Sequence, residues 1–196
     1  MFKTYAGGKF TEGIVKGPVE KVLISQSKGE GLQIAHTKPG KVILVAGGTG
    51  IYPFSDFIDL LYKEQLMNDR PDAKAEILTL SPVLESNPFK SFNFEMLAAF
   101  QHIEDMHPIT LDQLTYLAEK GRLNLTLKFR ENPHGKIQEG ANIKFTKENF
   151  QNILQDKMDK GDVSRVWICG PPGMNIVVSK FLRETYKDPN LYLIVW

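Results

Sequence analysis

Cysteine is nearly absent from this sequence, since Cys169 is the only one among 196 residues. A single cysteine excludes an internal disulfide, so we expect an intracellular reducing compartment, either cytoplasmic or mitochondrial. The opening letters, MFKTY, show no apolar core of the secretory kind. Cys169 is therefore either a small buried hydrophobe or a functional thiol.

An excess of charge and a long apolar run are also missing. The formal net charge is +1, which gives no electrostatic footprint for nucleic acid. The longest apolar stretch, residues 42–54, is interrupted by glycines and too short for a bilayer, so no direct membrane span is expected. The four histidines are scattered, and no metal site is predicted.

What the sequence does contain is an alternation of apolar runs and amphipathic segments. Near-continuous apolar runs are typical of parallel strands that are covered on both faces. The pattern predicts an α/β fold with a doubly wound, five-stranded parallel sheet over residues 39–196. The expected strands are 42–47, 76–81, 123–129, 165–169 and 191–196. The expected helices are 54–61, 92–102, 111–120, 146–156 and 174–182, with Thr110 and Thr146 as N-caps.

Two of the expected strands end in unusual loops. Residues 46–53 read AGGTGIYP, in which glycines allow backbone N–H groups to approach a phosphate and Thr49 adds a hydroxyl. Pro53 suits a first helical turn. The second loop, residues 169–173, reads CGPPG and is stiff. Either loop alone could be only a tight turn, and the first departs from the G-x-G-x-x-G spacing.

Together the two loops and the terminal Trp196 resemble the ferredoxin–NADP reductase superfamily, which includes the NADH–cytochrome reductases and ferric reductases. The resemblance implies a domain that binds NAD or NADP and passes hydride to a flavin. It implies catalytic roles for Cys169, as a contact of the nicotinamide ring rather than a nucleophile, and for Trp196, as the aromatic that covers the flavin or holds the place of the nicotinamide. Otherwise, Cys169 is a buried thiol without a role and Trp196 a hydrophobic plug. The implied cofactor-binding residues are Gly47, Gly48, Thr49, Gly50, Ile51, Pro53, Gly170, Pro171, Pro172 and Met174.

The flavin part of such a reductase is short here. Residues 1–38 are too few to close a six-stranded barrel, so they are expected to be a remnant of an FAD-binding barrel. Gly8, Lys9 and Thr11 resemble the Gly-Gly-Lys stretch that meets the flavin pyrophosphate. We therefore expect FAD to be shared with, or supplied by, a missing segment or a partner protein.

The adenosine end leaves the choice between NAD and NADP open. Relatives carry an Asn-Arg-Thr-like stretch, expected here at residues 81–86, but this sequence has SPVLES. Glu85 could accept a hydrogen bond from a ribose hydroxyl, as in NAD sites. Arg130 could reach the extra phosphate of NADP, although a solvated arginine is the alternative.

Two functions follow from these observations. The first is the nucleotide-binding part of a flavin-dependent oxidoreductase, which passes electrons onward to a protein or metal acceptor. The second is a non-catalytic accessory subunit, derived from a reductase, within a larger redox or respiratory assembly. The two intact loops favour the first function, and the shortened flavin region favours the second.

Overall fold

The computed structural model describes residues 31–100, 102–129, 147–159 and 163–195. Gly31–Trp196 form one compact unit, and the predicted boundary at residues 38 and 39 stays a prediction, because residues 1–30 lie outside the described part. The strands are β1 Gly40–Gly47, β2 Phe92–Phe100, β3 Leu123–Phe129, β4 Val163–Cys169 and β5 Tyr192–Ile194. The α-helices are α2 Ser55–Asp69, α3 Lys74–Leu80, α4 Pro108–Glu119, α5 Lys147–Asp159 and α6 Pro172–Tyr186. The short 3-10 helices are η1 Ile34–His36, η2 Gly48–Phe54, η3 Pro71–Ala73, η4 Pro82–Ser86 and η5 Ile103–Asp105.

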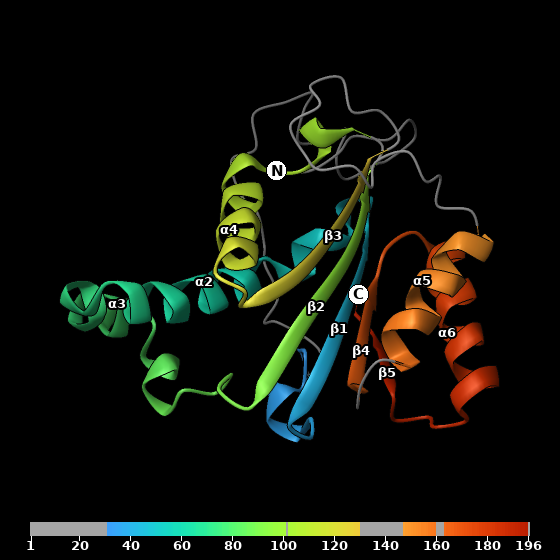
Figure 1. Ribbon diagram of the computed structural model, residues 1–196, viewed down its shortest axis with the longest axis horizontal. Helices are drawn as coiled ribbons and strands as arrows, with labels where there is room; N and C mark the ends of the chain where they lie inside the picture. The colour runs from blue at the N-terminus through green and yellow to red at the C-terminus, as the bar shows by residue number, and fades with distance from the viewer. Residues whose placement is uncertain (1–30, 101, 130–146, 160–162, 196) are drawn as a thin grey trace, which may run out of the picture. The chain divides into compact units, whose positions relative to one another are not determined.

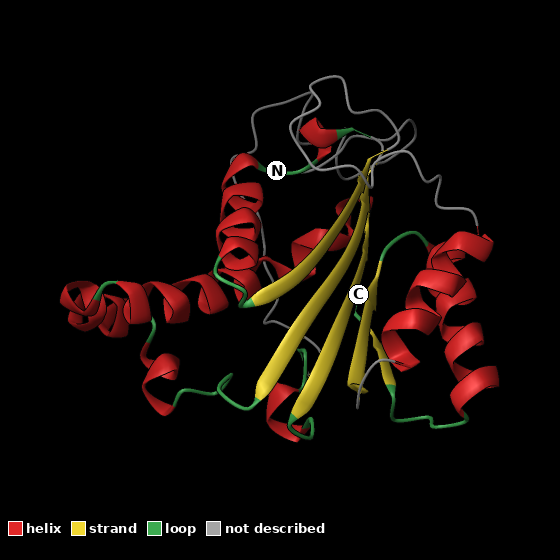
Figure 2. Ribbon diagram, viewed as in Figure 1, coloured by secondary structure: helices red, strands yellow, loops and turns green. Residues whose placement is uncertain are grey.

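All five strands form one parallel sheet in the order β3-β2-β1-β4-β5, so the predicted fold class is confirmed. Helices α2 and α4 lie on one side of the sheet and α5 and α6 on the other (Figure 1). Because β1 is buried on both faces, its side chains alternate between two cores. Val42, Leu44 and Ala46 belong to one core, and Ile43 and Val45 to the other. Figure 2 shows the sheet between these two helical layers.

Helix α2 follows β1 and contributes the apolar stripe that the sequence predicts. Phe57, Ile58 and Leu61 are buried against the sheet. The ring of Phe57 meets that of Trp167 from β4 edge-on, with the ring centres 5.4 Å apart. The stripe therefore anchors the segment after the first glycine loop to the strand that carries the second loop.

The second strand lies elsewhere than the sequence analysis expects. Residues 76–81 were expected to be a strand, but Lys74–Leu80 is helix α3, with only Ile77 buried and Leu80 69% exposed. An interior strand of a parallel sheet must bury both faces, which this run does not do.

Residues 92–102, in turn, were expected to be a helix, but Phe92–Phe100 is strand β2. Its residues Glu95, Met96, Leu97 and Ala98 favour a helix by propensity. However, Phe92, Phe94, Met96, Ala98 and Phe100 alternate onto one core with period two. Burial between β1 and β3 therefore outweighs the local propensity.

The expected N-caps also need revision. Helix α4 begins at Pro108 after the N-cap residue His107, so Thr110 lies inside the helix, where it is buried. Proline is favourable in the first turn because its missing N–H has no helical partner there. Thr146 lies outside the described residues.

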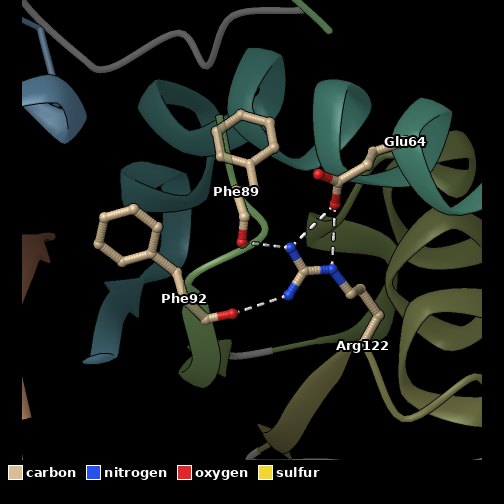
Figure 3. A network of polar contacts seen from close by, with 4 residues as sticks. All are labelled: Glu64, Phe89, Phe92 and Arg122. Carbon is tan, nitrogen blue, oxygen red and sulfur yellow. Dashed lines mark hydrogen bonds and ion pairs between the residues drawn. The ribbon is translucent and has the colours of Figure 1, made fainter. Parts of the chain in front are cut away.

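Ion pairs of two buried carboxylates, Glu95 and Glu64, fasten helices to the sheet at two places. Glu95 of β2 pairs with Lys157 of α5, and Lys41 of β1 lies 3.8 Å from the same carboxylate. On the other face, Arg122 donates to Glu64 of α2 and to the main-chain carbonyls of Phe89 and Phe92 (Figure 3). Glu95 is the fourth residue of β2 and Arg122 directly precedes β3, so neither pair involves the two glycine loops.

Candidate nucleotide-binding site

The two unusual loops lie next to each other at the carboxyl edge of the sheet. Strands β1 and β4 are hydrogen-bonded neighbours, and Ala46 is in register with Cys169. From β1 the chain continues to β2 on one side, whereas β4 lies on the other side. The strand order therefore reverses between β1 and β4, which is where open α/β sheets bind their ligands.

Glycine at position 50 allows the loops to touch. A Cβ atom on Gly50 would lie 2.1 Å from the main-chain oxygen of Cys169 and 2.7 Å from the nitrogen of Gly170. No side chain fits at these distances, so the backbone of the first loop packs directly on the backbone of the second. The glycine is therefore required by this close approach.

Met174, in the first turn of α6, fills the space between the loops. A Cβ on Gly47 would lie 2.6 Å from the sulfur of Met174, and a Cβ on Gly170 would lie 2.3 Å from its methyl carbon. By contrast, a Cβ on Gly48 or on Gly173 would meet nothing within 4 Å. Gly48 has a φ of +54°, which favours glycine. The open surface of the site therefore lies over Gly48 and Gly173.

The predicted cofactor-binding residues differ in their exposure. Gly48, Gly170 and Met174 are partly exposed, whereas Thr49, Pro53, Pro171 and Pro172 are exposed. Gly47 and Gly50 are buried, and they act through the close packing described above. Ile51 is a core residue with no exposed surface, so its side chain cannot touch a ligand at this edge.

The second loop leads into helix α6, and no side chain in the described part of the chain caps its N-terminus. The N-cap residue is Pro171, and Pro172 is the first helical residue. Met174 and Asn175 both donate their main-chain N–H groups to the carbonyl of Pro171. Helix α6 has 15 residues, so its dipole places partial positive charge at this end. Because Pro172 has no N–H and the N–H groups of Met174 and Asn175 bond to Pro171, the attraction for an anionic group that approaches over Gly173 comes mainly from the helix dipole.

Asn175 lies in the same turn, and its relative exposure is only 2%. Among the described residues, no partner donates a hydrogen bond to its side-chain oxygen. Sequence analysis missed this residue, because an asparagine directly after a Gly-Met pair gives no recognisable signal.

Cys169 ends β4 with a buried side chain. It belongs to the same core as Ala46, Ile51 and Phe54. Burial raises the pKa of the Cys169 thiol, so the thiol stays protonated at neutral pH. A protonated thiol is a poor nucleophile, and the geometry therefore favours a packing or contact role.

The turn after β2 completes this edge, and sequence analysis did not place it there. The hydroxyl of Tyr52 in the first loop donates to the main-chain oxygen of Asp105 in η5, at 3.5 Å. Because β2 had been expected at residues 76–81, Glu85 was expected at the adenosine end. Glu85 instead lies in η4, which precedes β2 and so belongs to the opposite edge of the sheet. Tyr52, an aromatic residue two positions after the last glycine of the first loop, was the available signal for this cross-link.

The remaining predicted residues cannot be placed. Gly8, Lys9, Thr11, Arg130 and Trp196 lie outside the described residues. Within the described ranges, no group of three or more histidine, cysteine, aspartate or glutamate side chains could hold a metal ion. No helix among the described residues has the length and apolar character to cross a membrane.

Comparison with known proteins gives similarity in structure only. No family model matches the sequence, and no curated protein matches it significantly. The structure resembles the CS-b5R domains of human Ncb5or in the NAD+ form, with a TM-score of 0.58, 18% identity, and coverage of 98% of this chain and 47% of that one. It also resembles ferredoxin-NADP+ reductase from Plasmodium falciparum, with a TM-score of 0.50, 14% identity, and coverage of 80% of this chain and 53% of that one.

The chain thus spans about half the length of these two solved structures. Their sequence identities are low, so the likeness concerns the fold. The five-stranded parallel sheet agrees with the resemblance stated from the two loops. The described part of the chain therefore has the fold of the NAD(P)-binding domain of ferredoxin–NADP reductases and cytochrome b5 reductases.

Proposed function

We propose that this chain is the nucleotide-binding part of a flavin-dependent NAD(P)H oxidoreductase. The observation that carries the proposal is the backbone contact between Gly50 and Cys169 at the point where the strand order reverses. That contact joins two loops into one surface with an open glycine on each, Gly48 and Gly173. The fold of the two solved structures supports the same reading.

The residues of this surface fit a dinucleotide. The diphosphate would lie over Gly48 and Gly173, near the uncapped first turn of α6, where partial positive charge favours an anion. Thr49 is exposed and has a hydroxyl that can donate to a phosphate oxygen. The nicotinamide would lie toward Cys169, whose protonated thiol cannot compete as a nucleophile for the ring.

The flavin would come from a preceding segment or from a partner protein. When both cofactors are bound, the dinucleotide supplies a hydride from its dihydronicotinamide ring and the flavin accepts it, which leaves NAD(P)+ and reduced flavin. The part played by this chain is to bind the dinucleotide and to orient it, which is catalysis by positioning. The final acceptor of the electrons is a protein or a metal group outside this chain.

The proposal is tested by measuring NADH and NADPH binding to the purified chain by calorimetry, with Gly173→Glu and Gly173→Gln as a matched pair. A side chain at position 173 meets open space, so both variants should fold. The new carboxylate would occupy the positive end of α6 and repel a diphosphate, and we expect about tenfold weaker binding for Gly173→Glu. Gly173→Gln, which has the same shape without the charge, should bind nearly as the unmodified chain does.

Two results would contradict the proposal. Binding that is equally tight in both variants would place the nucleotide elsewhere. Absence of any NADH or NADPH binding by the folded chain would remove the nucleotide-binding function and favour the accessory subunit instead. If a flavin-bearing partner is found, a stable complex with it and NAD(P)H-dependent bleaching of its visible flavin absorbance would extend the result to the full reaction.

A further inference from the structure

The thioether of Met174 lies against both glycine loops. A Cβ on Gly47 would lie 2.6 Å from its sulfur, and a Cβ on Gly170 would lie 3.0 Å from the same sulfur and 2.3 Å from the methyl carbon. The side chain also packs against the core that contains Ile43 and Val45. The sulfur is therefore packed on bare backbone, and no room is left for a further heavy atom between it and the glycines.

The other methionines of the described chain are placed differently. Met96, Met106 and Met158 are buried. Met67 is partly exposed near the end of α2, toward the opposite edge of the sheet. Met174 is partly exposed and directly follows Gly173, where the site is open. Among the residues that the structure describes, Met174 is thus the methionine that a small solute can reach at the carboxyl edge.

We propose that Met174 is a site of reversible oxidation by hydrogen peroxide, and that its sulfoxide weakens dinucleotide binding; the second part rests on the proposed function. The sulfur attacks one peroxide oxygen, so that an S–O bond forms and the O–O bond breaks. The proton of the attacked oxygen passes to the departing hydroxide, which leaves as water. Sulfur is oxidised by two electrons and peroxide is reduced by two, and methionine sulfoxide reductases restore the thioether.

The sulfoxide does not suit the space between the loops. Oxidation converts a flexible apolar side chain into a polar, chiral one with an additional heavy atom. Held against glycine backbone and an apolar core, the new S–O group would lose its hydrogen bonds to water, which costs free energy. The side chain consequently turns outward, and the packing between Gly47 and Gly170 is lost. A dinucleotide that needs both loops in place then binds more weakly.

The test compares nucleotide binding to the full chain before and after treatment with hydrogen peroxide. Mass spectrometry of peptides shows which methionines have gained an oxygen atom. We expect Met174 to be oxidised before Met96, Met106 and Met158, and the affinity for NADH to fall about tenfold. Methionine sulfoxide reductases with dithiothreitol should restore the affinity. Dithiothreitol alone should not, which separates this effect from reversible oxidation of Cys169.

Met174→Leu and Met67→Leu form a matched pair of variants. Each is compared with itself before treatment, so that a change in its starting affinity does not enter the result. Met174→Leu should keep its own affinity through the treatment, because it has no sulfur between the loops. Met67→Leu should lose affinity as the unmodified chain does. Saturating NADH should also slow the oxidation of Met174, because a bound dinucleotide covers this edge.

The outcomes separate this inference from the function on which it rests. Oxidation of Met174 without loss of affinity, or an equal loss in Met174→Leu, would overturn the role of the sulfoxide. Oxidation of Met174 no faster than that of the buried Met96 would overturn the site itself. Absence of nucleotide binding before treatment would overturn the proposed function. Peptide analysis would still test the oxidation site, and urea denaturation the packing, since the midpoint should fall further in the unmodified chain than in Met174→Leu.

Discussion

The side chain of Cys169 is buried at the end of β4, and burial raises the pKa of its thiol. Because the thiolate is the reactive form, the folded chain should react with a disulfide reagent about tenfold or more slowly than free cysteine at neutral pH. The rate should rise only as the pH exceeds the ordinary range of a cysteine pKa. As the sequence has one cysteine, the released chromophore reports this residue alone.

Two further measurements make the labelling result specific. In denaturant the thiol should react at the rate of free cysteine, which shows that the fold causes the protection. Saturating NADH should slow the reaction of the folded chain further if the nicotinamide lies toward Cys169. Reaction at the free rate without denaturant would show that the thiol is accessible and the packing at the end of β4 is wrong.

The contact between the two loops depends on the glycine at position 50. The variant Gly50→Ala places a Cβ 2.1 Å from a main-chain oxygen, and backbone cannot move aside as the end of a side chain can. We expect the free energy of unfolding to fall by about 2 kcal/mol or more, with loss of nucleotide binding. Urea denaturation followed by circular dichroism measures the first effect, and calorimetry with NADH measures the second.

Gly173→Ala is the matched control for that substitution. Its Cβ meets open space in the first turn of α6, and its φ is not in the left-handed region. Alanine there restricts the unfolded chain and suits a helix, so stability should rise by about 0.5 kcal/mol. Equal stability losses in the two variants would mean that the loops do not touch as described.

A hydrogen bond between helices α2 and α4 predicts a pH dependence at the alkaline end. The hydroxyl of Tyr116 donates to Asp69, which raises the pKa of Tyr116 to about 12 and lowers the pKa of Asp69. A raised tyrosine pKa gives stability that is present below the unfolded value of about 10 and is lost as the pH rises toward 12. The lowered pKa of Asp69 gives stability that is present above the unfolded carboxyl pKa and is lost in acid.

An ultraviolet titration of tyrosinate absorbance measures this effect. Asp69→Asn should move one tyrosine from about 12 toward its ordinary pKa of about 10. Asp72→Asn is the control, because Asp72 pairs with Arg70 and does not contact Tyr116. A titration curve that Asp69→Asn leaves unchanged would contradict the hydrogen bond.

Which elements could be predicted from the sequence depends on how many signals agree. Strand β1 and helix α2 are apolar in the right period and are joined by glycines, so pattern and turn chemistry give the same answer. The residues of β2 favour a helix by propensity. The segment is a strand because it pairs with β1 and β3, and this pairing is visible only in the assembled sheet. The error at β2 moved the expected adenosine end to residues 81–86. The η5 turn, whose residue Asp105 accepts the hydrogen bond from Tyr52, was consequently missed. Both glycine loops were nevertheless predicted at the ends of the correct strands.

In the molecule as a whole, the candidate binding site and a stabilising ion pair lie at opposite edges of the sheet. The glycine loops and the η5 turn lie at the carboxyl edge, whereas Arg122 precedes β3 and bonds the carbonyl of Phe92, the first residue of β2 (Figure 3). In the Glu64–Arg122 pair the carboxylate is buried and the guanidinium is partly buried, with side-chain exposures of 7% and 17%. A buried pair that loses one partner leaves an uncompensated charge, so Arg122→Met should lower the free energy of unfolding by about 3 kcal/mol or more.

The double variant Arg122→Met with Glu64→Leu decides what the pair contributes. Removing both charges avoids the unpaired carboxylate, so the double variant should recover part of the lost stability, although two main-chain carbonyls still lose their donor. Arg70→Met is the control, because the exposed Arg70–Asp72 pair should contribute less than about 1 kcal/mol. For every variant that remains folded, NADH affinity should match that of the unmodified chain, since the substitutions lie at the amino edge. A double variant less stable than Arg122→Met would contradict this account of the pair, and a selective loss of NADH affinity would contradict the separation of the two edges.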